Sequence, residues 1–180
     1  REELMECLEY FGRLWQERAG KPGDDLISML ANGESTKDML ERPAEYLGNL
    51  ILLIVGGNDT TRNSLTGGVL ALNQFPEEFD KLKANHDLIN SMVPEIIRWQ
   101  TPLAHMRRIA LEDTILNGQT IKKGDKVVMY YGAANRDPGQ FDQPDTFQID
   151  RQPNRHLAFG MGAHLCLGNN LARMNMSVIF

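Results

Sequence analysis

The chain has 180 residues, which is enough for one domain with a sizeable hydrophobic core. Its 42% hydrophobic and 24% charged residues exclude a disordered chain, and its net charge of −5 gives no reason to expect nucleic-acid binding. The longest apolar run, residues 50–55, is too short to cross a membrane, and no signal-peptide pattern opens the chain.

The first hundred residues have a helical pattern. Periodic apolar positions, interrupted by Pro and Gly, predict helices over residues 1–19, 25–30, 43–73, 77–83 and 88–99. Asp25 is expected to cap the second helix, and Pro43 suits the first turn of the third. Pro94 falls in the fifth helix, where proline is tolerable only in the first turn because it has no N–H to donate.

The pattern changes after Pro102. Short β-type segments cover residues 106–110, 114–116 and 127–131, with turns at Asn117-Gly118 and at residues 123–125. Residues 136–155 form a long irregular segment rich in Pro, Asp and Gln, which in a compact domain is usually functional or well anchored. A last helix follows Cys166. The expected fold class is therefore mainly α with a small antiparallel β element.

The most informative stretch is the glycine-rich loop FGMGAHLCLG at residues 159–168. A cysteine ahead of a helix can be a thiolate ligand, because unpaired N–H groups and the positive end of the helix dipole stabilise negative sulfur. Gly160 and Gly162 allow the loop to fold tightly and to direct N–H groups at the sulfur of Cys166. A cysteine thiolate is one of the few axial ligands that proteins use for haem iron.

This loop resembles the haem-binding signature F-G-x-G-x-H-x-C-x-G of the cytochrome P-450 haem-thiolate monooxygenases, with every fixed position filled. The resemblance implies a cytochrome P-450-like fold, heme b as cofactor and Cys166 as the iron ligand, with Phe159 and Gly160 in the same cofactor-binding loop. A structural cysteine in a glycine-rich turn is the alternative. With Cys166 as a ligand only Cys7 is left, so no disulfide framework remains, which fits a cytoplasmic protein.

A second stretch, GGNDTT at residues 56–61, lies within the long predicted helix. Each glycine should cost that helix about 1 kcal/mol relative to alanine, and Asn, Asp and Thr are weak helix formers, so a local opening of the helix is expected. The stretch resembles the family's oxygen-binding groove. The resemblance implies that Thr60 hydrogen-bonds bound oxygen and that Asp59 helps to relay protons. A kinked helix packed closely on a neighbour is the structural alternative.

Glu95 and Arg98 lie at i and i+3 on one helix face, which alone describes a common surface pair. Their place in the chain resembles the family's E-x-x-R pair, and Arg151 matches the arginine that joins it. A carboxylate held by two guanidiniums is a directional clamp. The three residues are therefore predicted to tie the irregular segment to the core, in a structural role.

Buried haem propionates need cationic or hydrogen-bonding partners. Arg108 and His164 match the family's propionate-binding positions. An ordinary strand arginine and a loop histidine are the alternatives. Arg107, next to Arg108, would point to the opposite face of a strand.

The resemblance implies insertion of one oxygen atom of O2 into an apolar substrate, with electrons from a ferredoxin-type donor and its reductase. The chain is expected to be the C-terminal portion (1–180) of a single haem-thiolate domain, without its N-terminal half and last strands. Phrases such as GGNDTTRNS and EIIRWQTPLAHMRR look like the bacterial alkane-hydroxylating branch. The aliphatic residues 50–55 suit a chain-like substrate, although a terpene or sterol side chain is equally allowed by the pocket.

Other classes of protein fit less well. A cysteine hydrolase would need a third group to orient His164 as a base for Cys166, and none is evident. A zinc module would need four ligands at short spacings. A non-catalytic thiolate-haem sensor or carrier would share Cys166 but would not need Asp59 and Thr60.

Overall fold

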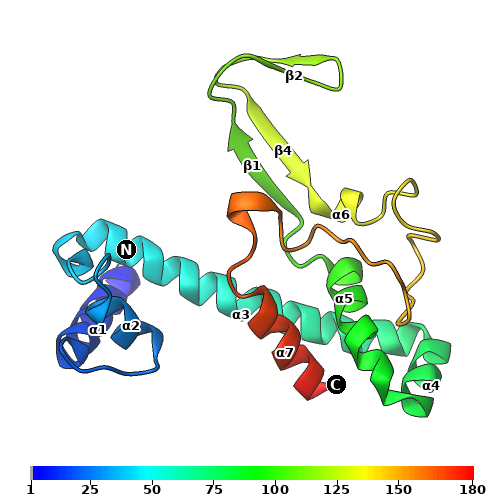
Figure 1. Cartoon of the computed structure of the whole chain (residues 1–180), viewed down its shortest axis with the longest axis horizontal. Helices are drawn as coiled ribbons and strands as arrows, with labels where there is room; N and C mark the ends of the chain where they lie inside the picture. Colours follow the sequence, from blue (N-terminus) through cyan, green and yellow to red (C-terminus); the bar gives the residue numbers. More distant parts are fainter. Residues whose placement is uncertain (1) are drawn as a thin grey trace. The chain divides into compact units, whose positions relative to one another are not determined.

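The computed structural model describes residues 2–180 (Figure 1). The chain divides into two compact units, residues 2–57 and residues 58–180, each with its own hydrophobic core. Helix α3 (Pro43–Gln74) contributes residues to both units. In the part of the chain that the structure describes, no helix is both long and apolar enough to span a membrane.

The first unit contains α1 (Glu2–Arg18), α2 (Leu26–Asn32) and the beginning of α3. A short 3-10 turn, Met39–Glu41, precedes α3. Asp25 caps α2 as predicted, since its side chain accepts the backbone N–H of Ser28 at 3.0 Å. The buried apolar residues of this unit are Trp15, Ala31, Met39, Tyr46 and Leu50.

The second unit is built on the remainder of α3 together with α4 (Pro76–Ala84), α5 (Ile89–Gln100) and α7 (Asn169–Ile179). A 3-10 turn, His86–Leu88, leads into α5. A Cβ on Gly68 would stand 2.7 Å from Ile96 Cδ1, so only glycine permits the close approach of α3 to α5 at this point. The core includes Met92, Ile96, Phe147, Ile149 and Met176.

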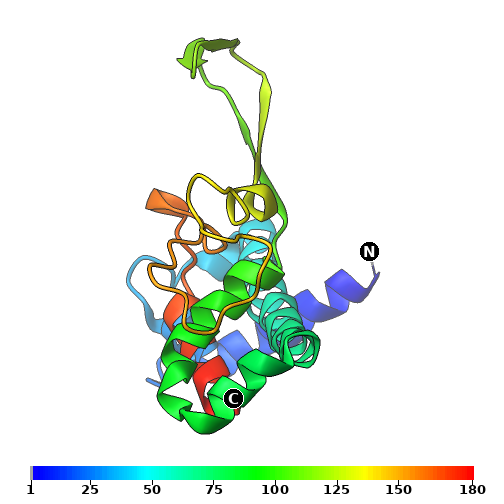
Figure 2. The same cartoon turned by 90° about the vertical axis from the view of Figure 1, so that its right-hand side faces the viewer.

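Two antiparallel strand pairs follow α5. Strand β1 (His105–Ile109) pairs with β4 (Lys126–Tyr130), and between them in the chain β2 (Thr114–Leu116) pairs with β3 (Gln119–Ile121) in a hairpin. Both strand pairs extend away from α5 in the two views (Figures 1 and 2). The predicted Asn117-Gly118 turn is confirmed, and its positive φ angles of 47° and 76° are those of a two-residue hairpin turn.

The predicted fold class, mainly α with a small antiparallel β element, is confirmed. Strand β3 and the short helix α6 (Tyr131–Ala134) were not predicted, because β3 has one large apolar residue among its three and α6 is a single turn. Helix α3 runs without a break through residues 56–61, so the expected opening does not interrupt it.

The expectation for Pro94 was wrong, because Pro94 lies beyond the first turn of α5. Its missing N–H leaves the carbonyl of Asn90 without a helical donor. Asn90 is exposed, so water can hydrogen-bond this carbonyl at little cost.

Candidate functional site

The loop around Cys166 is shaped by its own backbone. The N–H of Cys166 donates to the carbonyl of Phe159 at 2.8 Å, which joins the two ends of the loop. The carbonyl of Cys166 accepts the side-chain amide of Asn169 at 2.8 Å and the backbone N–H of the same residue at 3.3 Å. Cys166 is therefore tied to the first residue of α7 and stands just before the helix, as predicted.

Gly160 allows the loop to make its turn. Its φ is 71°, and a Cβ there would lie 3.3 Å from the carbonyl oxygen of His164. Its N–H donates to the carbonyl of Leu157 at 2.8 Å. Any other residue would combine backbone strain with a close contact. The glycine is therefore required by the geometry of the loop.

The loop differs from the sequence expectation in one respect. We expected backbone N–H groups to point at the sulfur of Cys166, but the amides of Gly160, Leu165 and Cys166 donate to carbonyl oxygens. Cys166 is half-buried, and large apolar side chains around it are exposed. Met161, Leu165 and Leu167 are 75%, 54% and 93% exposed. The cysteine thus stands beside an apolar surface that is open to a ligand.

Phe159 and His164 lie in this loop, and Arg108, the other predicted propionate partner, lies on β1. The Phe159 ring packs against the guanidinium of Arg173, 5.3 Å from the ring centroid. His164 is exposed in the 3-10 turn Gly162–His164. Arg108 is half-buried on β1 and donates to the carbonyl of Arg107 at 3.0 Å. Among the described residues no carboxylate pairs with Arg108, so its charge is available to an anionic group.

The GGNDTT stretch lies on α3. Asp59 forms an exposed ion pair with Arg62 at 2.5 Å, and the carbonyl of Thr60 accepts the hydroxyl of Ser64 at 2.9 Å. Apart from the adjacent residues and the backbone of α3 itself, no atom of residues 2–57 lies within 4 Å of the point where a Cβ would stand on Gly56 or Gly57. Packing within the first unit therefore does not account for the two glycines.

Glu95, Arg98 and Arg151 come together in the structure. Arg98 donates to both oxygens of Glu95, at 2.7 and 2.8 Å, and Nε of Arg151 lies 3.0 Å from Oε2 and 3.2 Å from Oε1. Glu95 and Arg98 are fully buried, and Arg151 is 7% exposed. The surface-pair alternative is therefore wrong. A buried carboxylate with two guanidiniums is a strong, directional contact.

The cluster also holds the irregular segment by its backbone. Arg98 donates to the carbonyls of Asn135 and Pro144, each at 2.8 Å, and Arg151 donates to the carbonyls of Asp142 and Thr146 at 2.6 and 2.9 Å. Residues 136–155 contain no helix or strand. The guanidiniums thus replace the ladder of hydrogen bonds that secondary structure would supply.

Three polar residues near this cluster were missed by the sequence reasoning. Asn154 donates to Glu95 Oε2 at 3.0 Å. Fully buried Asn135 accepts the N–H of Leu157 at 2.7 Å and donates to Thr101 Oγ1 at 2.9 Å. Short polar residues in an irregular segment carry no periodic signal, so no pattern could have identified them.

The third missed residue is His156, whose ring nitrogens are both buried and have no hydrogen-bond partner among the described residues. Burial, followed by the charges of Arg173 and Arg98, lowers the pKa of His156 to about 4. Its ring packs on that of Phe159, with centroids 5.5 Å apart. The imidazole is therefore neutral in the folded protein at neutral pH.

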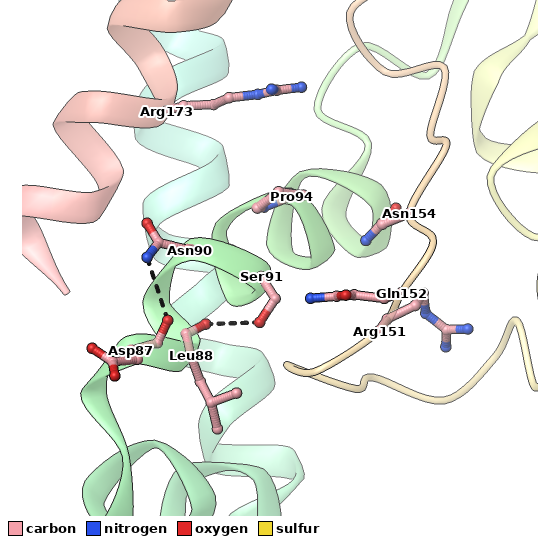
Figure 3. A pocket seen from close by; sticks show the side chains of 9 residues that line it. All are labelled: Asp87, Leu88, Asn90, Ser91, Pro94, Arg151, Gln152, Asn154 and Arg173. Atoms are coloured by element: carbon pink, nitrogen blue, oxygen red, sulfur yellow. Dashed lines mark hydrogen bonds between the residues drawn. The ribbon is translucent and has the colours of Figure 1, made fainter.

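A surface pocket of about 390 Å³ lies between the beginning of α5, α7 and residues 151–154 (Figure 3). Ser91 and Pro94 line it on one side, Asn154 on another, and Arg173 reaches toward it from α7. The pocket does not include Cys166 or Thr60. It borders the Glu95 cluster and does not coincide with the candidate site.

Comparison with known proteins agrees with this geometry. Residues 4–180 match the family "Cytochrome P450". Linalool 8-monooxygenase of Pseudomonas putida is 40% identical over 177 residues, covering 98% of this chain and 43% of that protein. The steroid C26-monooxygenase of Rhodococcus jostii is 42% identical over 177 residues, with 98% and 37% covered.

A solved structure, cytochrome P450-153 from Novosphingobium aromaticivorans, is 47% identical with a TM-score of 0.93, and 99% of this chain and 44% of that one are covered. The chain belongs to the cytochrome P450 family. It spans less than half the length of the curated relatives it matches. The resemblance to the alkane-hydroxylating branch is supported by the cytochrome P450-153 neighbours.

Proposed function

We propose that this chain is the C-terminal part of a single haem-thiolate monooxygenase domain, in which Cys166 is the axial ligand of heme b. The observation that carries the proposal is the loop of residues 159–168. Its backbone is closed on itself by the Cys166 to Phe159 hydrogen bond, while the cysteine stands beside exposed apolar side chains. Bound haem would bury these side chains and take the sulfur as its ligand.

The donor set of the described residues fits a haem. A thiol, the guanidinium of Arg108 without a carboxylate partner and the exposed imidazole of His164 match an iron and two propionates in chemistry. Gly160 keeps the loop tight, and Phe159 packs against the core of the second unit. When bound, haem supplies the centre at which O2 is activated.

Thr60 and Asp59 are proposed to act on protons in the oxygen groove. The Thr60 hydroxyl would hold a proton near the oxygen, and Asp59 would receive protons from solvent, since it is exposed and pairs with the exposed Arg62. The open space around Gly56 and Gly57 within their unit supports a groove at this place. Glu95, Arg98 and Arg151 are proposed to hold the structure and to take no part in turnover.

The proposed reaction inserts one atom of O2 into a C–H bond of an apolar substrate and reduces the other atom to water. Two electrons and two protons are needed for the balance, and a ferredoxin-type donor with its reductase would supply the electrons. We propose a medium-chain alkane, hydroxylated at its end, as the substrate, on the basis of the phrase resemblance and the cytochrome P450-153 neighbours. The linalool and steroid relatives favour a terpene or sterol side chain as the second candidate.

The test uses the full-length protein with a surrogate ferredoxin and reductase. We expect a linear alkane to shift the haem toward high spin and to give the terminal alcohol as product, measured by gas chromatography. A terpene and a steroid serve as parallel substrates. Turnover of either of these with none of the alkane would overturn the alkane assignment, and a haem protein without any turnover would favour the sensor or carrier alternative.

A further inference from the structure

Glu78 is a buried carboxylate on α4 that lies outside the Glu95 cluster. It is 5% exposed, and its Oε2 accepts the N–H of Ile149 at 2.8 Å. Its Oε1 accepts the ammonium of Lys81 at 2.7 Å. Ile149 is itself fully buried in the core of the second unit. A charged group in such surroundings is retained only with hydrogen-bond partners, and the amide of Ile149 is one of the two that it has.

The residue before Ile149 is held from another helix. The N–H of Gln148 donates to Glu95 Oε1, on α5, at 3.0 Å. Two consecutive amides of the irregular segment therefore bond to buried carboxylates of two helices, α5 and α4. The segment passes α5 in both views (Figures 1 and 2). It is pinned at this point by both helices.

The two carboxylates, Glu78 and Glu95, differ in the cations that they contact. Glu95 has two buried guanidiniums, whereas Lys81, the partner of Glu78, has a side chain that is 45% exposed. The hydrogen bond that Lys81 donates to Glu78 is the main cause that raises the pKa of Lys81 above its usual value. An ion pair with one exposed partner contributes little. Lys81 also lies 3.4 Å from Asp150 of the irregular segment, but the two side chains are 45% and 51% exposed, so this pair contributes little. Of the contacts of Glu78, the hydrogen bond to Ile149 is the one that holds the irregular segment directly.

We infer that Glu78 is a positioning residue for the cysteine loop, acting through Ile149. The inference rests on the proposed haem-thiolate function. The chain runs from Ile149 to Arg151 in the Glu95 cluster, then to Leu157, whose N–H is held by Asn135, and then into the loop that closes at Cys166. Without Glu78, the buried amide of Ile149 has no acceptor. Residues 148–149 then keep only the hydrogen bond from Gln148 to Glu95.

The experiment uses the full-length holoprotein with Glu78→Leu, Glu78→Gln and the matched control Glu77→Ala, which alters the exposed neighbour. The ferrous carbon monoxide spectrum reports the ratio of thiolate-ligated to thiolate-free haem. We expect Glu78→Leu to lower this ratio about fivefold, which corresponds to about 1 kcal/mol. Glu78→Gln keeps an acceptor oxygen for Ile149 and should retain most of the thiolate band.

Denaturant titration distinguishes a role in positioning the cysteine loop from a role in the stability of the whole protein. With Glu78→Leu the thiolate band should be lost at a lower denaturant concentration than the far-ultraviolet helix signal, whereas in the wild type and in Glu77→Ala the two should be lost together. Coincident transitions in Glu78→Leu, or a ratio equal to that of Glu77→Ala, would overturn the inference. If the wild type itself shows no thiolate band, the proposed function fails instead.

Should Glu78→Leu fail to fold, Glu78→Gln and Lys81→Met decide the question. Both leave an acceptor for the N–H of Ile149, so both should keep the thiolate band. Loss of the band in either variant would show that the charged contacts of Lys81 with Glu78 and Asp150, and not the hydrogen bond to Ile149, hold the loop, and the inference would be wrong.

Discussion

The irregular segment of residues 136–155 and the cysteine loop of residues 159–168 follow each other in the chain but are held in opposite ways. The segment is fixed by side chains from other elements, among them the fully buried Glu95 and Arg98. The loop is fixed by its own backbone and leaves its side chains exposed, with Leu167 at 93%. The comparison teaches that the buried charged groups stabilise the segment and not the loop. The loop therefore leaves Cys166 accessible to a ligand.

Replacing the proposed ligand tests the loop side of the comparison and has the largest expected effect. Cys166→Ala in the full-length protein should abolish the red-shifted Soret band of the ferrous carbon monoxide complex, because no other thiolate stands in the loop. The far-ultraviolet spectrum should be unchanged. Cys7→Ala, which alters the other free cysteine, is the control. A Cys166→Ala protein that keeps the band would refute the assignment.

Removing the carboxylate at the centre of the cluster tests the segment side. Glu95→Ala should lower the free energy of unfolding by about 3–5 kcal/mol, because two buried guanidiniums lose their counter-charge. Denaturant titration of the full-length protein measures it, with Glu112→Ala as an exposed control. A stable, haem-loaded Glu95→Ala enzyme that turns over slowly would instead indicate a catalytic role.

His156, whose ring nitrogens are buried, lies in sequence between the segment and the loop, and it predicts that the stability of the protein decreases in acid. Its pKa in the folded state is about 4, below the ordinary value of 6.5, so the unfolded state binds the proton more tightly. The free energy of unfolding is therefore highest above pH 6.5. It decreases by roughly 3 kcal/mol in total as the pH drops toward 4.

The measurement for His156 is the free energy of unfolding from pH 7 to pH 4, compared between the wild type and His156→Phe. The variant should show a shallower dependence on pH, because it has no imidazole to protonate beside Arg173 and Arg98. His86→Phe, at an exposed histidine, should keep the wild-type dependence. Parallel curves for the wild type and His156→Phe would mean that His156 does not titrate in this range.

The smallest expected change concerns the proposed oxygen groove, since Thr60→Ala should leave both folding and haem ligation intact. We expect less product for each reduced nicotinamide consumed, with the difference released as hydrogen peroxide, because a proton is no longer held at the groove. Thr66→Ala, an exposed position on the same helix, is the control. Unchanged coupling in Thr60→Ala would favour a structural reason for the GGNDTT stretch.

Much of the fold could be predicted because its signals are local. Apolar periodicity located α1, α3, α4 and α5 closely, and Asn117-Gly118 predicted a turn whose positive φ angles suit those two residues. The cysteine loop was likewise visible in the order of its residues, since Gly160 is needed for a backbone angle that lies within the loop itself. Contacts between residues that are close in the sequence can be recognised from the local order of residue types.

By itself, the sequence determined the family, the helices and the residues of the candidate loop. Only the tertiary structure decided which polar residues hold the irregular segment. Glu78 meets Ile149 across 71 positions and Glu95 meets Arg151 across 56, and no local spacing encodes such contacts. The same holds for His156, whose neutral state depends on burial and on guanidiniums of α5 and α7. Hydrogen bonding and desolvation are set by three-dimensional neighbours, which the folded chain alone brings together.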